Sequence, residues 1–336
     1  MIHIGIIGCG HWGPNHIRIF SFLRESKVIA AADLDTNRLE YVAEQHPEIS
    51  IHKEYMRLLE NPRIDAIVVS TPTHTHYTLV KASLLAGKHV LCEKPLCQNV
   101  TEGEELLTLA RQADRILMVG HIFLFNPGII MLKNLIKTED LGRIYYLSAT
   151  RTNLGPIRND VNVVYDLATH DISIFNFLFD SSPLEVSSVG AAFLQETIED
   201  VAFISLTYPQ HIMANIRVSW LDPRKVRQIT VVGDKKMATW DDLATIGPVI
   251  IYDKGVAKEP YYNCFGEFQL LSREGDITIP KIKMEEPLKL QNQYFLSCLK
   301  TGKVPISDGV SGVKLVKTLS AINKSLILKG QSVPVI

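Results

Sequence analysis

The sequence predicts an α/β protein of two domains, of which the first is a doubly wound parallel sheet and the second carries a large open, mostly antiparallel sheet. The chain has 336 residues, which is more than one hydrophobic core usually serves. Short runs rich in Val and Ile alternate with helical patterns up to residue 120, and longer runs of alternating polarity follow. We therefore expect domains at 1–120 and 121–336.

In the first domain, continuous apolar runs predict buried parallel strands. These runs are Ile2–Ile7, Val28–Ala32, Ala66–Val69, His89–Leu91 and Ile116–Val119. Helical periodicity predicts helices between them. These helices are Trp12–Leu23, Thr36–Gln45, Tyr55–Glu60, His76–Ala86 and Thr101–Gln112. Gly87 follows one of these patterns directly and is a good helix stop.

The second domain opens with a predicted helix, Pro127–Lys137, and continues with strands whose polarity alternates. The predicted strands are Arg143–Arg151, Val186–Phe193, Val201–Tyr208, His211–Trp220, Val226–Val232, Met237–Asp241 and Val249–Tyr252. Further helices are expected over Val164–Leu178, Leu288–Leu299 and Val310–Leu328. A sheet of this size needs a cover, so we expect a homo-oligomer, a dimer or tetramer, which a monomer mass by light scattering would contradict.

The composition excludes several classes of protein. Lys and Arg number 35 against 36 for Asp and Glu, without a run of like charge, so neither a nucleic acid nor a membrane partner is expected. The cysteines have neither the spacing of a zinc site nor the density of a disulfide framework, which indicates no metal and a reducing cytoplasm. They are Cys9, Cys92, Cys97, Cys264 and Cys298. Neither a signal-peptide pattern at the start nor an apolar span of membrane length is apparent.

A glycine motif follows the first predicted strand. In Gly8-Cys9-Gly10-His11-Trp12-Gly13, the glycines permit a tight turn, the approach of a pyrophosphate and close helix packing, whereas the plainer interpretation is a turn that needs small residues. Asp33 lies 20 residues after Gly13, at the end of the next strand, where a carboxylate binds the adenosine ribose. Together these features predict a Rossmann domain that binds a dinucleotide, with His11 and Trp12 at its loop.

The residue at position 33 also predicts which dinucleotide is bound. A carboxylate repels a 2′-phosphate, and the following Leu34-Asp35 supplies no neighbouring cation to receive one. The sequence therefore predicts NAD in preference to NADP, and equal rates at low NADP would contradict this.

Two further segments follow strands at the same edge of the sheet. The nicotinamide half of the cofactor is expected to lie beside Ser70, Thr71, Pro72 and His76. One alternative is a metal bound by His74 and His76. Another is a helix capped by Thr73, with both histidines exposed. Glu93-Lys94-Pro95 places a lysine at the cofactor, where it can stabilise an alkoxide that develops as hydride leaves. The alternative for Lys94 is a surface lysine in a turn.

In the second domain, Asp166 and His170 are four residues apart in a helical pattern, so they are expected to share a face. A histidine with a pKa near its reference value of about 6.5 is suited to accept a hydroxyl proton, and a nearby carboxylate can orient it. Taken alone, such a pair is more often a structural hydrogen bond. Asp171 is expected to point elsewhere and to cap or bind backbone.

These motifs resemble the glucose–fructose oxidoreductase and inositol dehydrogenase (Gfo/Idh/MocA) family over nearly the whole chain. Four features carry the resemblance: the Gly8–Gly13 motif, Thr71-Pro72 with His76, Ala86–Val90 leading into Glu93-Lys94-Pro95, and Asp166 with His170. The resemblance implies NAD(P) in the first domain, sugar-like substrates, family roles for Lys94, Asp166 and His170, and a cis Lys94–Pro95 bond. Leu124 stands where relatives often carry an Arg.

Within the family, Gly10–Asn15 and Asn153–Asn162 resemble the sugar-nucleotide 3-dehydrogenases. That resemblance implies oxidation at C3 of UDP-N-acetylglucosamine or its uronic acid, with a pyridoxal-phosphate aminotransferase as pathway partner. Arg151 and Arg158 are candidates for gripping a diphosphate or carboxylate. The expected substrate-binding residues are His121, Asn126, Arg151, Arg158, Asn162 and Tyr165.

The expected mechanism has His170 accept the hydroxyl proton, Lys94 stabilise the oxyanion and Asp166 orient the base, although two coupled groups can exchange roles. Other substrates stay open, namely a free sugar or a cyclitol such as inositol. Redox-neutral glycoside cleavage is another alternative. A third is an NAD-binding regulator without chemistry, against which the retained Lys94, Asp166 and His170 argue.

Overall fold

The computed structural model describes residues 1–258 and 270–336. The chain divides into two compact units: unit 1 comprises Met1–Phe125 and Glu285–Ser320, and unit 2 comprises Asn126–Met284 and Ala321–Ile336. The expected division at residue 120 differs from these bounds, because it assigns the C-terminal helices to the second domain. Each unit is therefore built from two separate stretches of chain.

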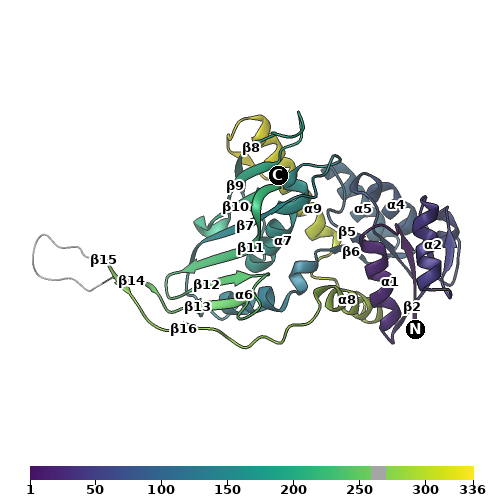
Figure 1. Cartoon of the computed structure of the whole chain (residues 1–336), viewed down its shortest axis with the longest axis horizontal. Coiled ribbons are helices and arrows are strands. Elements are labelled where there is room, and N and C mark those ends of the chain that lie inside the picture. Colours follow the sequence, from purple (N-terminus) through teal and green to yellow (C-terminus); the bar gives the residue numbers. More distant parts are fainter. Residues whose placement is uncertain (259–269) are drawn as a thin grey trace, which may run out of the picture. The chain divides into compact units, whose positions relative to one another are not determined.

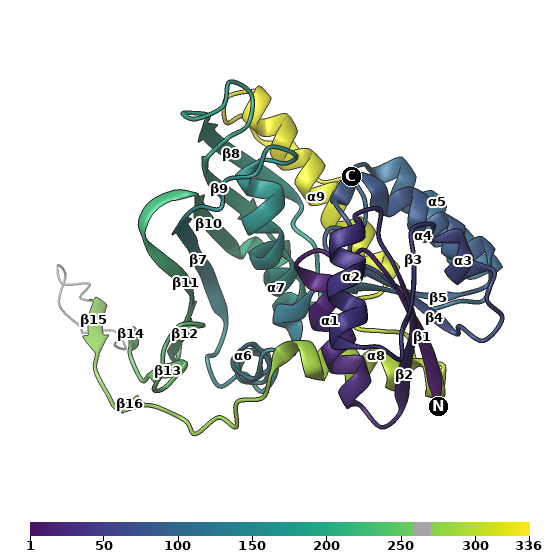
Figure 2. The same cartoon turned by 45° about the vertical axis from the view of Figure 1, so that its right-hand side comes forward.

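Unit 1 contains a six-stranded parallel sheet with helices on both faces. In sheet order its strands are β3 (Ser50–His52), β2 (Ser26–Ala32), β1 (Ile2–Ile7), β4 (Ala66–Val69), β5 (His89–Glu93) and β6 (Leu117–Gly120). Its N-terminal helices are α1 (Trp12–Phe22), α2 (Thr36–Gln45), α3 (Met56–Leu59), α4 (His76–Leu85) and α5 (Val100–Gln112). Figure 2 shows α1 and α2 on one face and α4 and α5 on the other. Strand order reverses at β1, and ligands of such sheets bind at this point.

The predicted elements of the first domain are confirmed, with ends that differ by one or two residues. Gly87 follows α4 with a φ of 72°, as expected for a helix stop. The exception is β3, which was not predicted. It has three residues, none of them buried, so it lacks the apolar run that marks the other strands.

The chain returns to unit 1 through α8 (Pro287–Thr301) and the first part of α9 (Gly309–Ile327). Val313 and Val316 of α9 are part of the core beneath the sheet, at 4% and 0% exposure. Just before α9, the Ser307 carbonyl accepts a hydrogen bond from the backbone N–H of Val119 in β6. The segment Glu285–Ser320 thus completes the core of unit 1.

Unit 2 contains a nine-stranded mixed sheet, visible in Figure 1. In sheet order its strands are β16 (Ile277–Thr278), β13 (Val249–Tyr252), β12 (Met237–Asp241), β11 (Leu221–Gly233), β7 (Ile144–Leu154), β10 (Met213–Ser219), β9 (Val201–Thr207), β8 (Glu185–Ala191) and β17 (Val333–Pro334). Only β7 and β10 pair in parallel among these strands, and all other pairs are antiparallel. A separate two-stranded sheet pairs β14 (Gly255–Lys258) with β15 (Leu270–Arg273) in antiparallel orientation. The expected mostly antiparallel sheet is confirmed.

One predicted helix of unit 2 is not α-helical over its whole length. The helix expected over Val164–Leu178 begins as a π-helix, Val164–Ala168, and becomes α-helical only in α7 (Thr169–Phe179). Helix α6 (Pro127–Lys137) matches its prediction and is capped by Asn126, whose side chain accepts from the N–H of Gly128.

The nine-stranded sheet has one buried and one exposed face. In β10, Ala214, Ile216 and Val218 are buried, and the alternate residues are exposed. In β9, Phe203 is exposed between two buried residues. The exposed face therefore carries large apolar side chains that no helix of unit 2 covers among the described residues.

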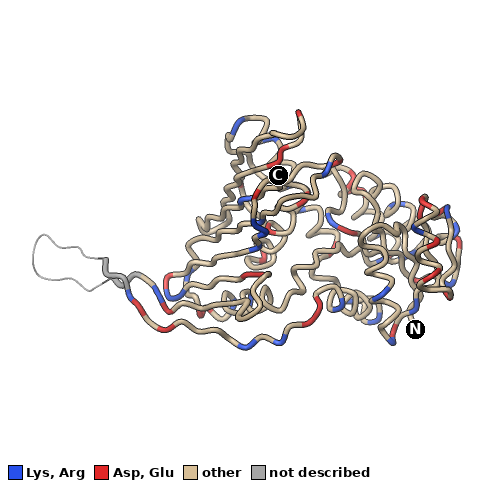
Figure 3. The backbone as a smooth tube through the Cα atoms, in the orientation of Figure 1, with Lys and Arg blue, Asp and Glu red and all other residues tan. Residues whose placement is uncertain are grey.

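The composition had led to expectations about the cysteines, the distribution of charge and membrane-spanning segments. Four cysteines are buried and free, and Cys264 lies outside the described residues. Basic and acidic residues are interspersed along the described parts of both units (Figure 3). Over the same residues, no helix is long and apolar enough to cross a membrane.

A buried ion pair lies in the core of unit 2. The guanidinium of Arg151 in β7 donates to both carboxylate oxygens of Asp171 in α7, at 2.9 and 2.8 Å, and both side chains are 2% exposed. The sequence had suggested that Asp171 caps a helix or binds backbone, but its carboxylate binds the Arg151 side chain instead. The pair fixes α7 against the sheet, and removing one partner would leave an uncompensated buried charge.

We predict that Arg151→Met lowers the free energy of unfolding by about 3–5 kcal/mol, because Asp171 then stays buried without its counter-charge. The double variant Arg151→Met/Asp171→Leu should recover most of that loss, since apolar residues of similar volume often replace a buried ion pair at little cost. Urea denaturation of the three proteins measures both values. Equal losses in the single and double variants would contradict the role of the pair.

Candidate cofactor and active site

The glycine loop between β1 and α1 has no room for side chains. Gly8 has a φ of 96°, and a Cβ there would lie 2.7 Å from the Ser70 carbonyl oxygen. A Cβ on Gly13 would overlap the carbonyl oxygen of Gly8. Only glycine at both positions lets the loop pack this closely, and the resulting cradle leads into the N-terminus of α1, which favours a phosphate group. This cradle fits the pyrophosphate of a dinucleotide.

Asp33 is held in place at the carboxyl end of β2. One carboxylate oxygen accepts from the backbone N–H of Cys9 at 2.6 Å, and the other accepts from that of Asp35 at 2.9 Å. Each oxygen keeps a lone pair, so the fixed carboxylate can still accept from ribose hydroxyls. Next to this loop, His11 is exposed and its ring lies edge-on to that of Trp12.

The expectation that no cation neighbours Asp33 is wrong. Arg38, in the first turn of α2, places its Nη1 3.8 Å from Asp33 and its Nε 3.4 Å from Asp35. Five residues separate Arg38 from Asp33, and inspection of only the two residues after Asp33 missed it. The helix that starts at Thr36 turns the side chain back toward the strand end.

The loop after β4 contacts the glycine loop. The Ser70 hydroxyl donates to the Gly8 carbonyl at 2.8 Å, and the Thr71 hydroxyl accepts from Thr75 at 2.7 Å. Pro72 is exposed beside them. Ser70 therefore braces the turn that holds the pyrophosphate cradle.

His76 has a different position from the one expected. Its ring is 1% exposed, with Nδ1 2.8 Å from the Pro95 carbonyl oxygen and Nε2 2.9 Å from that of Thr71. Burial lowers its pKa, and hydrogen bonds to the two carbonyls act in the opposite direction. We assign His76 a positioning role that ties the loops after β4 and β5 together, in place of a cofactor or metal contact.

Glu93 points into unit 1. Its carboxylate lies 2.9 Å from His16 Nε2 and accepts from the backbone N–H of Lys94 at 3.3 Å. The side-chain amide of Asn292 in α8 donates to Nδ1 of His16, at 3.2 Å, so the ring proton is on Nε2 and is donated to Glu93. A Cβ at Gly120 would lie only 3.2 Å from this carboxylate.

Lys94 stands at the carboxyl end of β5, directly after this anchored residue. It is half-buried, and its peptide bond to Pro95 is cis, as the family resemblance implied. With Glu93 fixed from α1 and Pro95 fixed by His76, the backbone on both sides of Lys94 is held. His16 and Asn292 were missed by sequence reasoning, although His16 lies one helical turn beyond Gly13 on the inner face of α1.

His121, expected to bind substrate, follows β6. Its side chain is almost wholly buried, and within the described parts of the chain neither ring nitrogen has a hydrogen-bond partner. Burial lowers its pKa to about 4, so the ring is neutral near pH 7. An unsatisfied polar ring beside Glu93 and Lys94 marks a place where a ligand group can bind. Leu124 is buried in the short helix that follows.

In unit 2, Asp166 lies in the π-helix and His170 in the first turn of α7. The spacing had predicted that one regular α-helical turn relates the two residues. The π-helical start of this segment shows that this is not so. The indole N–H of Trp220 donates to Asp166 at 3.2 Å, and Arg158 lies 3.4 Å from its other oxygen. Arg158 also holds Asp160, which raises the pKa of its guanidinium.

Three of the expected substrate-binding residues have structural partners. Asn126 caps α6 and donates to Asp242 at 3.2 Å, and Asn162 donates to Glu199 at 2.8 Å while it accepts from the N–H of Tyr165. Arg151 is buried against Asp171, as described above. Because the polar groups of Asn126 and Arg151 are already bound to protein partners, unlike those of the equally buried His121, we no longer expect these two residues to contact substrate.

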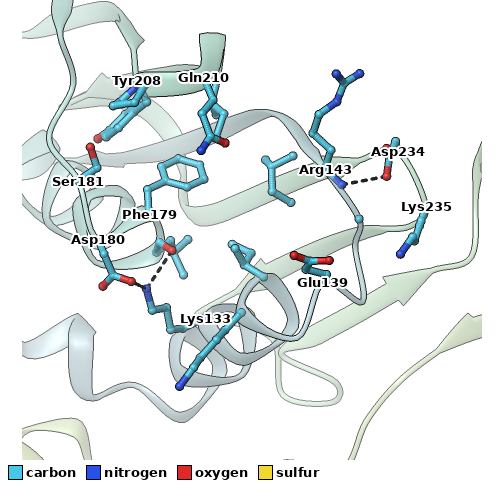
Figure 4. Close-up of a pocket in the computed structure, with 17 residues that line it drawn as sticks. Lys133, Glu139, Arg143, Phe179, Asp180, Ser181, Tyr208, Gln210, Asp234 and Lys235 are labelled. Atoms are coloured by element: carbon cyan, nitrogen blue, oxygen red, sulfur yellow. Dashed lines mark hydrogen bonds and ion pairs between the residues drawn. The ribbon is translucent and has the colours of Figure 1, made fainter.

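A hollow of about 610 Å³ lies elsewhere in unit 2, between the ends of α6 and α7 and the start of β7. Its polar groups do not converge: Figure 4 shows Lys133 turned to Asp180, and the side chain of Arg143 directed away from the hollow. It contains none of the expected site residues, so we do not place the substrate there. Among the described residues, no cluster of three or more potential ligands for a metal ion occurs.

Two family models match the chain. An oxidoreductase-family model with an NAD-binding Rossmann fold matches residues 2–121, and a GFO/IDH/MocA C-terminal domain model matches residues 129–239. The chain belongs to the Gfo/Idh/MocA oxidoreductase family. It is accordingly an oxidoreductase that binds NAD, and the glycine cradle and Asp33 are the parts of this structure that fit the cofactor.

Two relatives are similar to this chain over almost its whole length. A myo-inositol 2-dehydrogenase of Thermotoga maritima is 26% identical over 97% of this chain and 96% of its own length. A UDP-N-acetylglucosamine 3-dehydrogenase of Acidithiobacillus ferrooxidans is 26% identical over 94% of this chain and 95% of its own. A solved structure of that enzyme covers 97% of this chain and 99% of its own, at 25% identity and a TM-score of 0.82.

The pKa of His121 predicts an acid sensitivity. The unfolded chain protonates this histidine below pH of about 6.5, whereas the folded chain does so only near pH 4, so stability falls as the pH decreases between these values. Between pH 7 and pH 5, the His121 imidazole should lower the free energy of unfolding by about 2 kcal/mol. Over this pH range, we expect the free energy of unfolding of His121→Gln, measured by urea denaturation, to fall by about 2 kcal/mol less than that of the wild type. His74→Gln, at an exposed position, is the control, and parallel losses in wild type and His121→Gln would contradict the prediction.

Proposed function

We propose that this family member oxidises a secondary hydroxyl of a sugar, most specifically the C3 hydroxyl of a UDP-N-acetylglucosamine-type nucleotide sugar, to the 3-keto sugar. The observation that carries the oxidation is the position of Lys94 at the carboxyl end of β5, at the same edge of the sheet as the glycine loop, between two anchored neighbours. The similarity to UDP-N-acetylglucosamine 3-dehydrogenase over 94% of the chain supports the nucleotide sugar.

Each group has a role in this proposal that follows from its chemistry. NAD, when bound, supplies the acceptor for hydride. The ammonium of Lys94 stabilises negative charge that develops on the substrate oxygen as the C–H bond breaks. His170 accepts the hydroxyl proton, a task suited to an imidazole at neutral pH. Neutral His121 offers one ring N–H donor and one acceptor to a sugar hydroxyl.

Asp166 and Arg158 support the reaction from unit 2. Trp220 and Arg158 fix the carboxylate of Asp166, which we propose holds the catalytic base in orientation. Arg158 is half-buried and carries a planar fork of donors, so it is our candidate for a diphosphate or carboxylate of the substrate. Tyr165, beside Asp166, remains a candidate contact for the sugar.

A cyclitol is the second candidate substrate. The myo-inositol 2-dehydrogenase is as similar to this chain as the nucleotide-sugar enzyme is, at 26% identity over 97% of it. Both substrates present a secondary ring hydroxyl, so Lys94 and His170 could act in the same way on either of them. The difference is the nucleotide diphosphate, which requires a cation such as Arg158.

We also propose that the protein is a cytoplasmic homo-oligomer that associates through the exposed face of the nine-stranded sheet. Tyr146, Phe203 and Met213 on this face are 44%, 51% and 60% exposed. Large apolar side chains that lie on adjacent strands favour burial against a second copy. An aminotransferase that consumes the 3-keto product is the partner reaction we expect.

We predict that purified protein forms NADH from NAD with UDP-N-acetylglucosamine or its uronic acid, and not with glucose or myo-inositol. An aminotransferase with its amino donor should increase the yield, because it removes the ketone. NADH absorbance measures the reaction. NADH formation only with myo-inositol would contradict the nucleotide sugar, and sugar release without NADH would contradict net oxidation.

We predict that Lys94→Met lowers kcat by about 10²–10⁴-fold, because the developing oxyanion loses its cation. Cofactor affinity, followed by NADH fluorescence, should change far less, since Asp33 and the glycine loop are untouched. Lys27→Met, at an exposed position of β2, is the matched control and should keep wild-type turnover. Unchanged turnover of Lys94→Met would contradict the assignment.

A further inference from the structure

Buried polar groups gather where the segment Glu285–Ser320 rejoins unit 1. Like His121, three residues of this segment are buried and carry side-chain atoms that have no hydrogen-bond partner among the described residues. They are Gln291, with both amide atoms, Asn292, with Oδ1, and Ser307, with its hydroxyl oxygen. All three side chains are at 0% exposure. The segment therefore brings several unsatisfied polar atoms into the interior of unit 1.

Gln291 lies on the side of α8 that faces the end of β6. It is three residues before Tyr294, so the two side chains share one side of the helix. The ring of Tyr294 contacts that of Phe125, with 5.4 Å between the centroids, and its hydroxyl accepts from the backbone N–H of Ile306 at 3.1 Å. This side of α8 therefore faces both the short helix after β6 and the chain just before Ser307.

His121 and Ser307 belong to the same region. His121 directly precedes the short helix, and the Ser307 carbonyl accepts from the N–H of Val119, two residues earlier, at 2.7 Å. Burial lowers the pKa of His121, and the charges of Glu93 and Lys94 also act on it, so both charges lie near the ring. The polar region thus extends from α8 to the carboxyl end of β5.

The chemistry of these groups indicates what they bind. Buried polar atoms are almost always paired with protein groups or with ordered water, because an unpaired one is destabilising. The Gln291 amide has two N–H donors and an acceptor, and the Ser307 hydroxyl and a neutral His121 ring each have a donor and an acceptor. A cation needs acceptors and an anion needs donors. A mixed, uncharged set fits water, which makes about three such hydrogen bonds in protein interiors.

We propose that internal water lies between His121 and α8, and that Gln291 holds it as a positioning residue for the His121 ring. The water binds one ring nitrogen, which determines where the ring proton lies and leaves the other nitrogen to a sugar hydroxyl. Helix α8 would then hold two histidines, His16 directly through Asn292 and His121 through water. The role toward a sugar rests on the proposed function, whereas the water site does not.

A crystal structure of the full chain, at a resolution that shows ordered water, tests the site directly. We expect water within hydrogen-bond distance of the Gln291 amide and of one nitrogen of His121. The absence of water there would overturn the proposal, whether or not the buried side chains bond directly to one another. This observation requires neither a substrate nor a cofactor.

The variant Gln291→Leu distinguishes a water-bound amide from an unpaired one. Replacing an unpaired amide by an apolar group of similar size relieves an unfavourable burial, whereas replacing a water-bound amide leaves the water and His121 short of a partner. We therefore expect the midpoint of urea denaturation to fall, and to fall further than in Gln293→Leu, the same change at a partly exposed position of α8. A raised or unchanged midpoint would overturn the proposal.

The variant Gln291→Asn separates hydrogen bonding from packing. Asparagine keeps both amide functions but is one methylene shorter, so additional water can fill the gap. We expect its urea midpoint to lie closer to that of the wild type than the midpoint of Gln291→Leu does. The reverse order would show that side-chain volume alone matters at this position, and would overturn the proposal.

Turnover tests the positioning role. With NAD and UDP-N-acetylglucosamine, we expect Gln291→Leu to lower kcat by about tenfold and Gln291→Asn to stay within about threefold of the wild type, because partners that orient a histidine are worth about 10–100-fold in activity. NADH affinity, measured by fluorescence, should not change. An unchanged kcat in Gln291→Leu would overturn the positioning role. A wild type without turnover would instead contradict the proposed function, and the crystal structure and urea midpoints would still decide the water site.

Discussion

The architecture of unit 1 depends on keeping one carboxylate, that of Glu93, in the protein interior. A buried carboxylate is destabilising by several kcal/mol unless donors surround it. His16 from α1 and the Lys94 backbone supply those donors, and Asn292 from α8 fixes the ring of His16. Three separate segments of the chain therefore meet at the residue that precedes Lys94, the lysine we propose to be catalytic.

The same requirement explains why buried histidines lie next to the cofactor cradle without taking part in the proposed chemistry. His16 fixes the side chain of Glu93, and His76 fixes the carbonyl of Pro95 and the loop after β4. Both nitrogens of each ring lie within hydrogen-bond distance of a protein group, so neither ring presents a nitrogen to a substrate hydroxyl. The proposed proton transfer is accordingly assigned to His170, in unit 2.

The sequence was sufficient to predict features that depend on local chain geometry. The glycine motif, Asp33 and most strands follow from spacing and periodicity, which neighbouring residues determine. Pairs such as His16–Glu93 and Arg151–Asp171 join residues 77 and 20 positions apart, and no pattern in one sequence identifies such partners. For the same reason the pairing of Arg151 with Asp171 was not foreseen when Arg151 was expected to bind substrate. The spacing at Asp166 predicted a regular helix and did not reveal the π-helical turn there.

The discontinuity of unit 1 has a consequence for how the protein is made. Residues from Glu285 to Ser320 supply Val313 and Val316 to the core, Ser307 to the edge of β6 and Asn292 to His16. A ribosome has therefore to translate nearly the whole message before the nucleotide-binding unit can close. Until then the nascent N-terminal segment exposes an unfinished core, so its maturation is coupled to completion of the entire polypeptide.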